Sequence, residues 1–163
     1  KTKELLTLTS VLEKMPHVTF YWAGDGPYKN EVLPILEKYD NFEWLGSLEY
    51  PNKVRDFLSE IDVYALLSGI DMSPLTLLEA QLMKKPVIAT SVGGIPELMI
   101  NKKSGFLIEK GDPVELIKDL EIIFNNSEKS KEMGEVGRKF VIDNFSWEII
   151  VKKFVSDVKD LIK

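Results

Sequence analysis

Cysteine is absent from this sequence of 163 residues, and histidine occurs once, at His17. The absence of cysteine excludes disulfide bonds, thiolate nucleophiles and cysteine-bound metals, and it is compatible with a reducing compartment. A single histidine also excludes a metal site built from several imidazole groups. No apolar run reaches the roughly 20 residues that a membrane-spanning helix requires. The sequence therefore predicts neither a metal cofactor nor a membrane span.

The charge balance is acidic, with a formal net charge of -5 at pH 7. Binding to a nucleic-acid backbone needs clustered lysine and arginine, so no nucleic-acid partner is expected. Hydrophobic residues make up 44% of the chain and charged residues 29%, a mixture typical of globular proteins. The length suits one compact domain, and the helical pattern that opens directly at Lys1 leads us to expect a piece of a longer polypeptide.

Helical and strand-like apolar spacing alternate along the chain, which is typical of α/β folds. Strands are predicted at residues 18–23, 42–45, 63–67, 87–89 and 105–108. Helices are predicted at residues 1–14, from Pro27 to about Tyr39, at 52–61, at 73–83, near Pro96, and in three closing pieces after Asp112. Short apolar strands between helices predict an α/β fold with one Rossmann-like parallel sheet and helices on both faces.

The most informative segment covers residues 68–80, SGIDMSPLTLLEA, because it joins a predicted strand to a predicted helix. Parallel sheets bind ligands in such loops, at the carboxyl ends of their strands. Ser73 is predicted as the helix N-cap, with Pro74 at the first helical position. The amides of Leu75 and Thr76 would then point out of the helix and, with the helix dipole, form an anion site suited to a diphosphate.

Two carboxylates flank this predicted anion site. Asp71 lies in the loop before the helix, and Glu79 lies in the second helical turn. A carboxylate beside a phosphate site can accept hydrogen bonds from a vicinal diol such as that of ribose. A structural interpretation stays open, in which Ser73 and Pro74 only begin a helix and both acids are solvated.

Gly24 and Gly26 follow another predicted strand, where they allow a tight turn close to a ligand. A turn with no ligand explains these glycines equally well. They do not complete a dinucleotide-binding G-x-G-x-x-G motif, because the third glycine position holds Lys29. A nicotinamide-dependent enzyme is therefore disfavoured.

Other features have structural explanations. His17 stands next to a proline in a connection and is predicted to be a surface residue rather than a general base. The closing helix carries apolar residues at helical spacing, of which we expect part to be exposed in this chain: Trp147, Ile150, Phe154, Val158 and Leu161.

Asp71 and Glu79, with Ala80 after them, resemble the E-x7-E signature of retaining GT-B glycosyltransferases, the glycosyl transferases group 1 (GT4-like) family. The resemblance covers nearly the whole chain in the right order. The further matching segments are residues 24–27 (GDGP), 44–46 (WLG), 62–68 (DVYALLS), 85–90 (KPVIAT), 93–97 (GGIPE), 105–107 (GFL) and 145–147 (FSW).

The resemblance implies roles for the candidate residues. Glu79 would bind the ribose hydroxyls of a nucleoside diphosphate sugar, Asp71 would act as the catalytic residue that contacts the donor sugar, and the amides of Leu75 and Thr76 would hold the diphosphate. Ser73, Pro74, Gly24 and Gly26 complete the predicted donor site. In the family the sugar is transferred with retention of its anomeric configuration, usually without a metal ion.

The sequence departs from the family pattern in three ways. Asp71 replaces the usual Glu, and Met72-Ser73 replaces the usual Gly-Phe pair. The family's first strand and its diphosphate-binding Arg and Lys would precede the opening helix; that Arg is absent from this chain, and Lys1 and Lys3 stand near the Lys position but out of register.

From this resemblance we expect residues 1–163 to form one nucleotide-sugar-binding domain, with the amino-terminal acceptor domain and the first strand outside the chain. The implied enzyme is a hexosyltransferase of polysaccharide or glycolipid biosynthesis that uses a UDP-, GDP- or ADP-linked sugar and no cofactor. The chain alone is expected to transfer sugar barely or not at all. The expected location is cytoplasmic, or at the inner face of the cell membrane through the absent domain. Two alternatives stay open, a non-catalytic nucleotide-sugar-binding or scaffold module, and a GT-B-like epimerase or a phosphorylase that acts on sugars.

Overall fold

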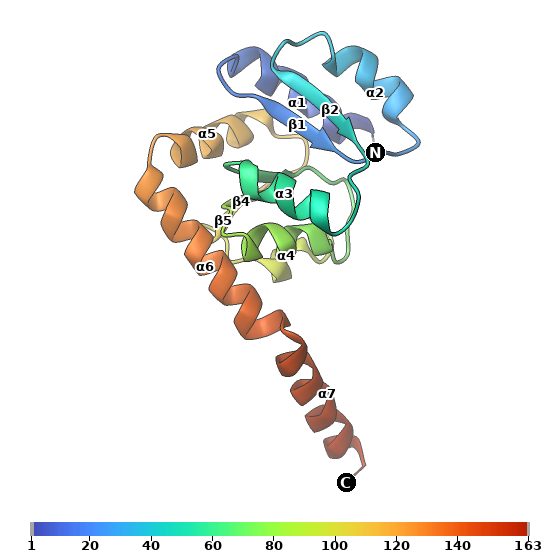
Figure 1. Ribbon diagram of the computed structural model, residues 1–163, viewed down its shortest axis with the longest axis vertical. Coiled ribbons are helices and arrows are strands. Elements are labelled where there is room, and N and C mark those ends of the chain that lie inside the picture. Colours follow the sequence, from blue (N-terminus) through green and yellow to red (C-terminus); the bar gives the residue numbers. More distant parts are fainter. Residues whose placement is uncertain (1, 163) are drawn as a thin grey trace.

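The computed structural model describes the backbone of residues 2–162 and the side chains from Leu6 to Ile162. Helices and strands alternate over most of the chain, and helices alone close it (Figure 1). The elements are α1 (Thr2–Lys14), β1 (Phe20–Ala23), α2 (Lys29–Leu36), β2 (Phe42–Gly46), α3 (Asn52–Glu60), β3 (Tyr64–Leu66), α4 (Leu75–Leu82), β4 (Val87–Thr90), the 3-10 turn η1 (Ile95–Leu98), β5 (Gly105–Ile108), α5 (Pro113–Phe124), α6 (Ser127–Phe145) and α7 (Trp147–Leu161).

All strand pairs in the described part of the chain are parallel, but they form two sheets rather than the single predicted one. β1 pairs with β2, and β4 lies between β3 and β5 in the second sheet. β1 and β3 therefore each pair on one side only. The sequence pattern predicts which segments are strands. It does not reveal that β1 and β3 are not joined by hydrogen bonds, either directly or through another strand of the described chain.

Helices cover both faces of the three-stranded sheet, as predicted, and the side chains of β4 alternate between the two faces. Ile88 packs with residues of α1, α5 and α6 on one face. Val87 and Ala89 pack with residues of α3, α4 and η1 on the other face. All four residues of β4 are buried, which explains why this strand reads as a continuous apolar run.

The two-stranded sheet has its own apolar layer against α1 and α2, and its position is fixed by Asn41 just before β2. Leu12 of α1, Val32 and Leu36 of α2 and Phe42 of β2 form the buried layer. The Asn41 side-chain amide donates hydrogen bonds to the carbonyl oxygens of Leu12, Met15 and Val18, at 3.2, 3.0 and 3.1 Å. These bonds tie the start of β2 to the connection between α1 and β1.

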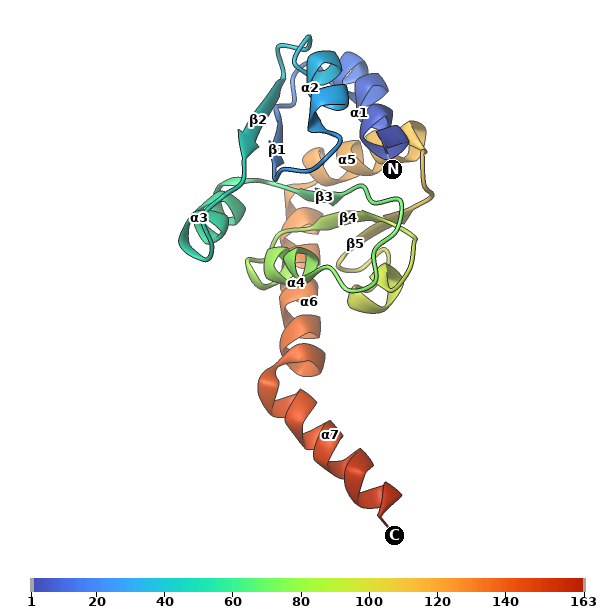
Figure 2. The same ribbon diagram turned by 90° about the vertical axis from the view of Figure 1, so that its right-hand side faces the viewer.

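The closing helix α7 projects away from the rest of the molecule (Figure 2). No residue of α7 is buried, and Trp147 and Phe154 are 80% and 67% exposed. Most of the predicted apolar stripe on this helix is therefore exposed in this chain. None of the helices in the described part of the chain combines the length and apolar character needed to span a bilayer.

Candidate functional site

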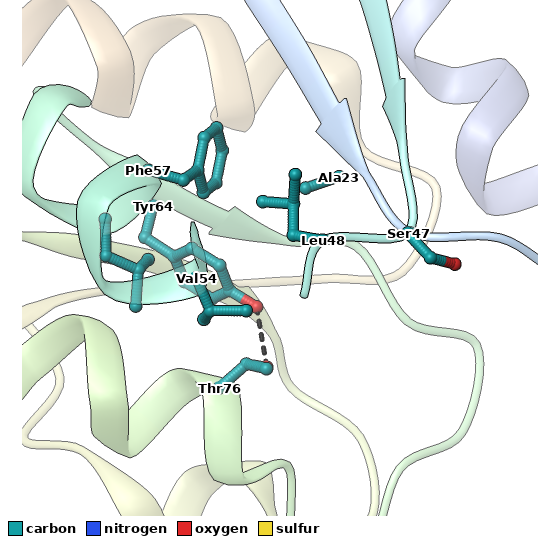
Figure 3. Close-up of a pocket in the computed structure, with 9 residues that line it drawn as sticks. Ala23, Ser47, Leu48, Val54, Phe57, Tyr64 and Thr76 are labelled. Atoms are coloured by element: carbon teal, nitrogen blue, oxygen red, sulfur yellow. Dashed lines mark hydrogen bonds between the residues drawn. The ribbon is translucent and has the colours of Figure 1, made fainter. Parts of the chain in front are cut away.

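The connections after β1 and β2 meet the first turn of α4 around a cavity of about 270 Å³. The cavity wall is largely apolar, and α3 contributes Val54 and Phe57 to it (Figure 3). The lining residues are Ala23, Gly24, Ser47, Leu48, Val54, Phe57, Leu58, Tyr64 and Thr76. Two of the predicted site residues, Gly24 and Thr76, are therefore brought to one cavity, although 52 positions separate them (76 − 24).

Tyr64 connects this cavity to both predicted carboxylates. Its hydroxyl donates a hydrogen bond of 2.8 Å to Oγ1 of Thr76 (Figure 3). Burial raises the pKa of the Tyr64 phenol, the Thr76 hydrogen bond opposes that rise, and the negative charges of Glu79 and Asp71 add to it. Asp71 and Glu79 thus act electrostatically on the same phenol. Sequence reasoning missed Tyr64, because its position within an apolar strand gave no sign that its hydroxyl faces α4.

The first turn of α4 differs from the prediction. The helix begins at Leu75, its N-cap is Pro74, and no side chain caps it. The prediction that Ser73 is the N-cap and Pro74 the first helical residue is therefore wrong by one position. The reason is that Pro74 is buried with an extended ψ of 109°, so its carbonyl is the first acceptor, for the Leu77 amide at 3.2 Å.

This helix start leaves an anion-binding geometry in place. The amides of Leu75 and Thr76 occupy the first two helical positions, where no carbonyl of the helix can accept from them. Both residues are exposed, Leu75 to 68%. Because no side-chain cap competes for these amides, an anion can accept hydrogen bonds there and also meet the positive end of the helix dipole.

Asp71 and Glu79 are both half-buried beside this helix start. Asp71 lies in the loop between β3 and α4, and its carbonyl oxygen accepts a hydrogen bond of 3.1 Å from the Gly94 amide. Glu79 lies one turn into α4, as predicted. Ser73 is exposed in the same loop and does not line the cavity.

The turn after β1 is held by hydrogen bonds within it and by one from β2. Gly24 has φ of +136°, a conformation that favours glycine, and its carbonyl accepts a hydrogen bond of 2.9 Å from Nε1 of Trp44. The Asp25 carboxylate accepts from Nζ of Lys29 and from the Gly26 amide, and these two contacts, Lys29 first, lower the pKa of Asp25. Gly26 does not line the cavity. This turn therefore shapes the cavity wall through Gly24.

Residues that could ligate a metal do not gather anywhere in the part of the chain that the structure describes. His17 is exposed in the connection between α1 and β1, as the sequence predicts. The candidate site therefore consists of the α4 amides, two carboxylates and the cavity at Tyr64 and Thr76.

The sequence is similar to several known glycosyltransferases. It is 30% identical over 141 residues to the N-acetyl-alpha-D-glucosaminyl L-malate synthase of Bacillus anthracis, an alignment that covers 86% of this chain and 37% of that enzyme. The structure resembles HepE of Anabaena in complex with UDP-glucose, with a TM-score of 0.77 at 17% identity over 91% of this chain and 44% of HepE.

A third likeness is to a separate domain. The carboxyl-terminal domain of a glycosyl transferase group 1 family protein from Francisella tularensis aligns with a TM-score of 0.76 at 20% identity, over 90% of this chain and 79% of that domain. The chain thus spans less than half the length of the Bacillus enzyme and of HepE.

The structural likenesses establish the fold, a Rossmann-like α/β arrangement shared with GT-B glycosyltransferases. The sequence adds the family, because the family model described as glycosyl transferases group 1 matches residues 5–126, well over half of the chain. On these grounds the chain belongs to the glycosyl transferases group 1 family.

Proposed function

We propose that this chain is the donor-binding domain of a retaining glycosyltransferase, and that it binds a nucleoside diphosphate sugar at the start of α4. The observation that carries the proposal is the uncapped first turn of α4, whose two outward amides lie between the segments that carry Asp71 and Glu79. An anion site flanked by hydrogen-bond acceptors matches a ligand that has both a diphosphate and sugar hydroxyls.

In this proposal the amides of Leu75 and Thr76 hold the diphosphate. When the bond between the sugar and the diphosphate breaks, negative charge accumulates on the diphosphate oxygens. Fixed amides and a helix dipole at that point stabilise the transition state more than the bound donor, so the same contacts bind and catalyse. The chemistry then needs no metal ion to neutralise the leaving group.

The two carboxylates have different tasks in the proposal. Glu79, one helical turn further along α4, accepts hydrogen bonds from the ribose hydroxyls of the donor. Asp71, in the loop before the helix, contacts the transferred sugar and acts as the catalytic residue. Ser73 and Pro74 shape the loop between them. The apolar cavity beside Thr76 and Gly24 offers a non-polar surface for the nucleobase.

The proposal also concerns the domain organisation. Residues 1–163 form one domain, and the acceptor binds to a separate amino-terminal domain of the full-length polypeptide. Support comes from the likeness to an isolated carboxyl-terminal domain and from the greater length of the other two relatives. Transfer would take place between the two domains in the cytoplasm, so this chain alone binds the donor but transfers sugar barely or not at all.

The donor is a UDP-, GDP- or ADP-linked sugar in this proposal, and UDP-glucose is the first to test because HepE binds it. Asp71, in place of the family's usual Glu, favours one second candidate, a module that binds nucleotide sugars without catalysis. A product assay on the full-length polypeptide separates the candidates. Transfer yields a glycoside and a nucleoside diphosphate, epimerisation yields a changed nucleotide sugar, and a non-catalytic module yields neither.

Calorimetric titration of this chain with UDP, GDP, ADP and their sugar conjugates tests the proposal. One nucleoside diphosphate should bind, and Glu79→Ala should weaken its binding at least about tenfold, the loss expected for hydrogen bonds to a charged group. Glu132→Ala, which removes an exposed carboxylate on α6, is the matched control and should leave binding unchanged. The proposal fails if no nucleoside diphosphate binds at millimolar concentration, or if both variants bind alike.

A further inference from the structure

The loop that carries Asp71, residues 67–74, is held at its base by a buried threonine from another strand. Thr90, the last residue of β4, is 1% exposed. Its hydroxyl accepts a hydrogen bond of 3.0 Å from the Ser68 amide and donates one of 2.7 Å to the Ser68 carbonyl. The Thr90 side chain therefore satisfies both backbone groups of Ser68, the second residue of the loop.

The same loop is held further along by two glycines that follow Thr90. The Gly94 amide donates a hydrogen bond of 3.1 Å to the Asp71 carbonyl. A Cβ atom placed on Gly93 would lie 1.9 Å from the Asp71 carbonyl oxygen, and one placed on Gly94 would lie 2.0 Å from that of Met72. Gly93 also has φ of +56°, a conformation that favours glycine. The backbone at Gly93 and Gly94 thus lies too close to the Asp71 loop for any residue that has a Cβ atom.

We infer that Thr90, Gly93 and Gly94 are positioning residues, which fix the Asp71 loop relative to the first turn of α4. The inference rests on the proposed function for its consequence, that these residues set the affinity for the sugar part of the donor. The diphosphate contacts on α4 itself do not depend on the loop. A displacement of the loop by about 1 Å would therefore weaken sugar recognition while the nucleoside diphosphate still binds.

Hydrogen exchange of this chain, measured by mass spectrometry, tests the inference without any ligand. Thr90→Val keeps the shape of the side chain and removes its hydroxyl, and Gly94→Ala forces the two backbones apart. Both should accelerate amide exchange in residues 67–74 at least about tenfold, while Thr90→Ser should exchange like the wild type.

Gly134→Ala is the matched control for the glycine variant. A Cβ atom there would also lie 2.0 Å from a carbonyl oxygen, that of Lys84, but on the α6 side of α4. It should leave exchange in residues 67–74 unchanged. Unchanged exchange in Thr90→Val, or equal acceleration in Gly134→Ala, would overturn the inference.

Titration with UDP and UDP-glucose separates positioning from general stability. Thr90→Val should raise the Kd of UDP-glucose about tenfold and that of UDP less than twofold. Adding Thr90→Val to Asp71→Asn should cause no further loss, because the loop then has no carboxylate to position. Equal losses for UDP and UDP-glucose would contradict positioning. If the wild type binds neither ligand, the proposed function fails for these donors, while hydrogen exchange still decides whether Thr90 and Gly94 hold the loop.

Discussion

At the scale of single residues, the carboxyl group of Asp119 on α5 lies in an environment that opposes its negative charge. Its residue is 2% exposed, and burial raises the pKa of the carboxyl to about 6. The negative charge of Glu115 adds to this rise, and Lys118, Lys102 and Lys129 oppose it. Asp119 lies on α5 and not in the candidate site. We therefore expect its raised pKa to affect the stability of the fold rather than ligand binding.

The direction of the pH dependence follows from this raised pKa. A carboxyl that binds its proton more tightly in the folded chain than in the unfolded one makes stability fall as pH rises from about 4 to 6. Asp119→Asn should therefore raise the free energy of unfolding by about 1–3 kcal/mol at pH 8 and change it little at pH 4. Urea unfolding at the two pH values measures this. Asp157→Asn, at an exposed position on α7, should show no such difference.

At the scale of elements, the contact between α4 and α6 depends on two glycines of α6. Gly134 faces the backbone at Lys84, and Gly137 faces the Gln81 side chain. A Cβ atom at Gly137 would lie 3.2 Å from Cγ of Gln81, which can yield slightly. At Gly134 the obstacle is a carbonyl oxygen of the backbone, which cannot yield without moving the connection between α4 and β4.

These two environments predict different outcomes for the same substitution. Alanine favours a helix over glycine by about 1 kcal/mol, so Gly137→Ala should be close to neutral. Gly134→Ala should lower the free energy of unfolding by about 1–3 kcal/mol, because the clash with Lys84 exceeds that gain. Urea or thermal unfolding compares the two variants. Equal stabilities would contradict the close packing of α6 on α4.

The strands and most of the helices could be predicted from the sequence, because each has its own local pattern. The strand Gly105–Ile108 matches its predicted bounds, and α5 begins directly after Asp112, as predicted. The start of α4 was misplaced because Ser73 and Pro74 have the composition of a helix start, while tertiary burial of Pro74 moves the start to Leu75.

Within the candidate site, the residues that lie on one continuous segment could be predicted from the sequence. Asp71, Thr76 and Glu79 lie together because a single loop and helix carry them. The hydrogen bonds of Tyr64 to Thr76 and of Thr90 to Ser68 could not be predicted. The first joins residues 12 positions apart and the second residues 22 positions apart, and both depend on the packing of β3, β4 and α4. The functional roles of the site residues stay predictions.

At the scale of the whole molecule, α7 contributes an apolar surface but no buried side chain. A chain that ends at Ser146 should therefore have the same free energy of unfolding as the full 163 residues, within about 0.5 kcal/mol, when both are unfolded with urea. It should also bind nucleotide equally well, since the candidate site lies at α4. A loss of more than about 1 kcal/mol would show that α7 supports the fold, contrary to its exposure.

The account of the whole molecule depends most on where a nucleoside diphosphate binds. The two-dimensional ¹H–¹⁵N spectrum of the labelled chain, recorded during titration with UDP, reports on each backbone amide. We predict that the largest shifts occur at Leu75 and Thr76, because their amides would donate to the diphosphate, with smaller shifts at the neighbouring residues 71–73. Saturable shifts confined to other parts of the chain, with the amides of Leu75 and Thr76 unchanged, would contradict the central claim.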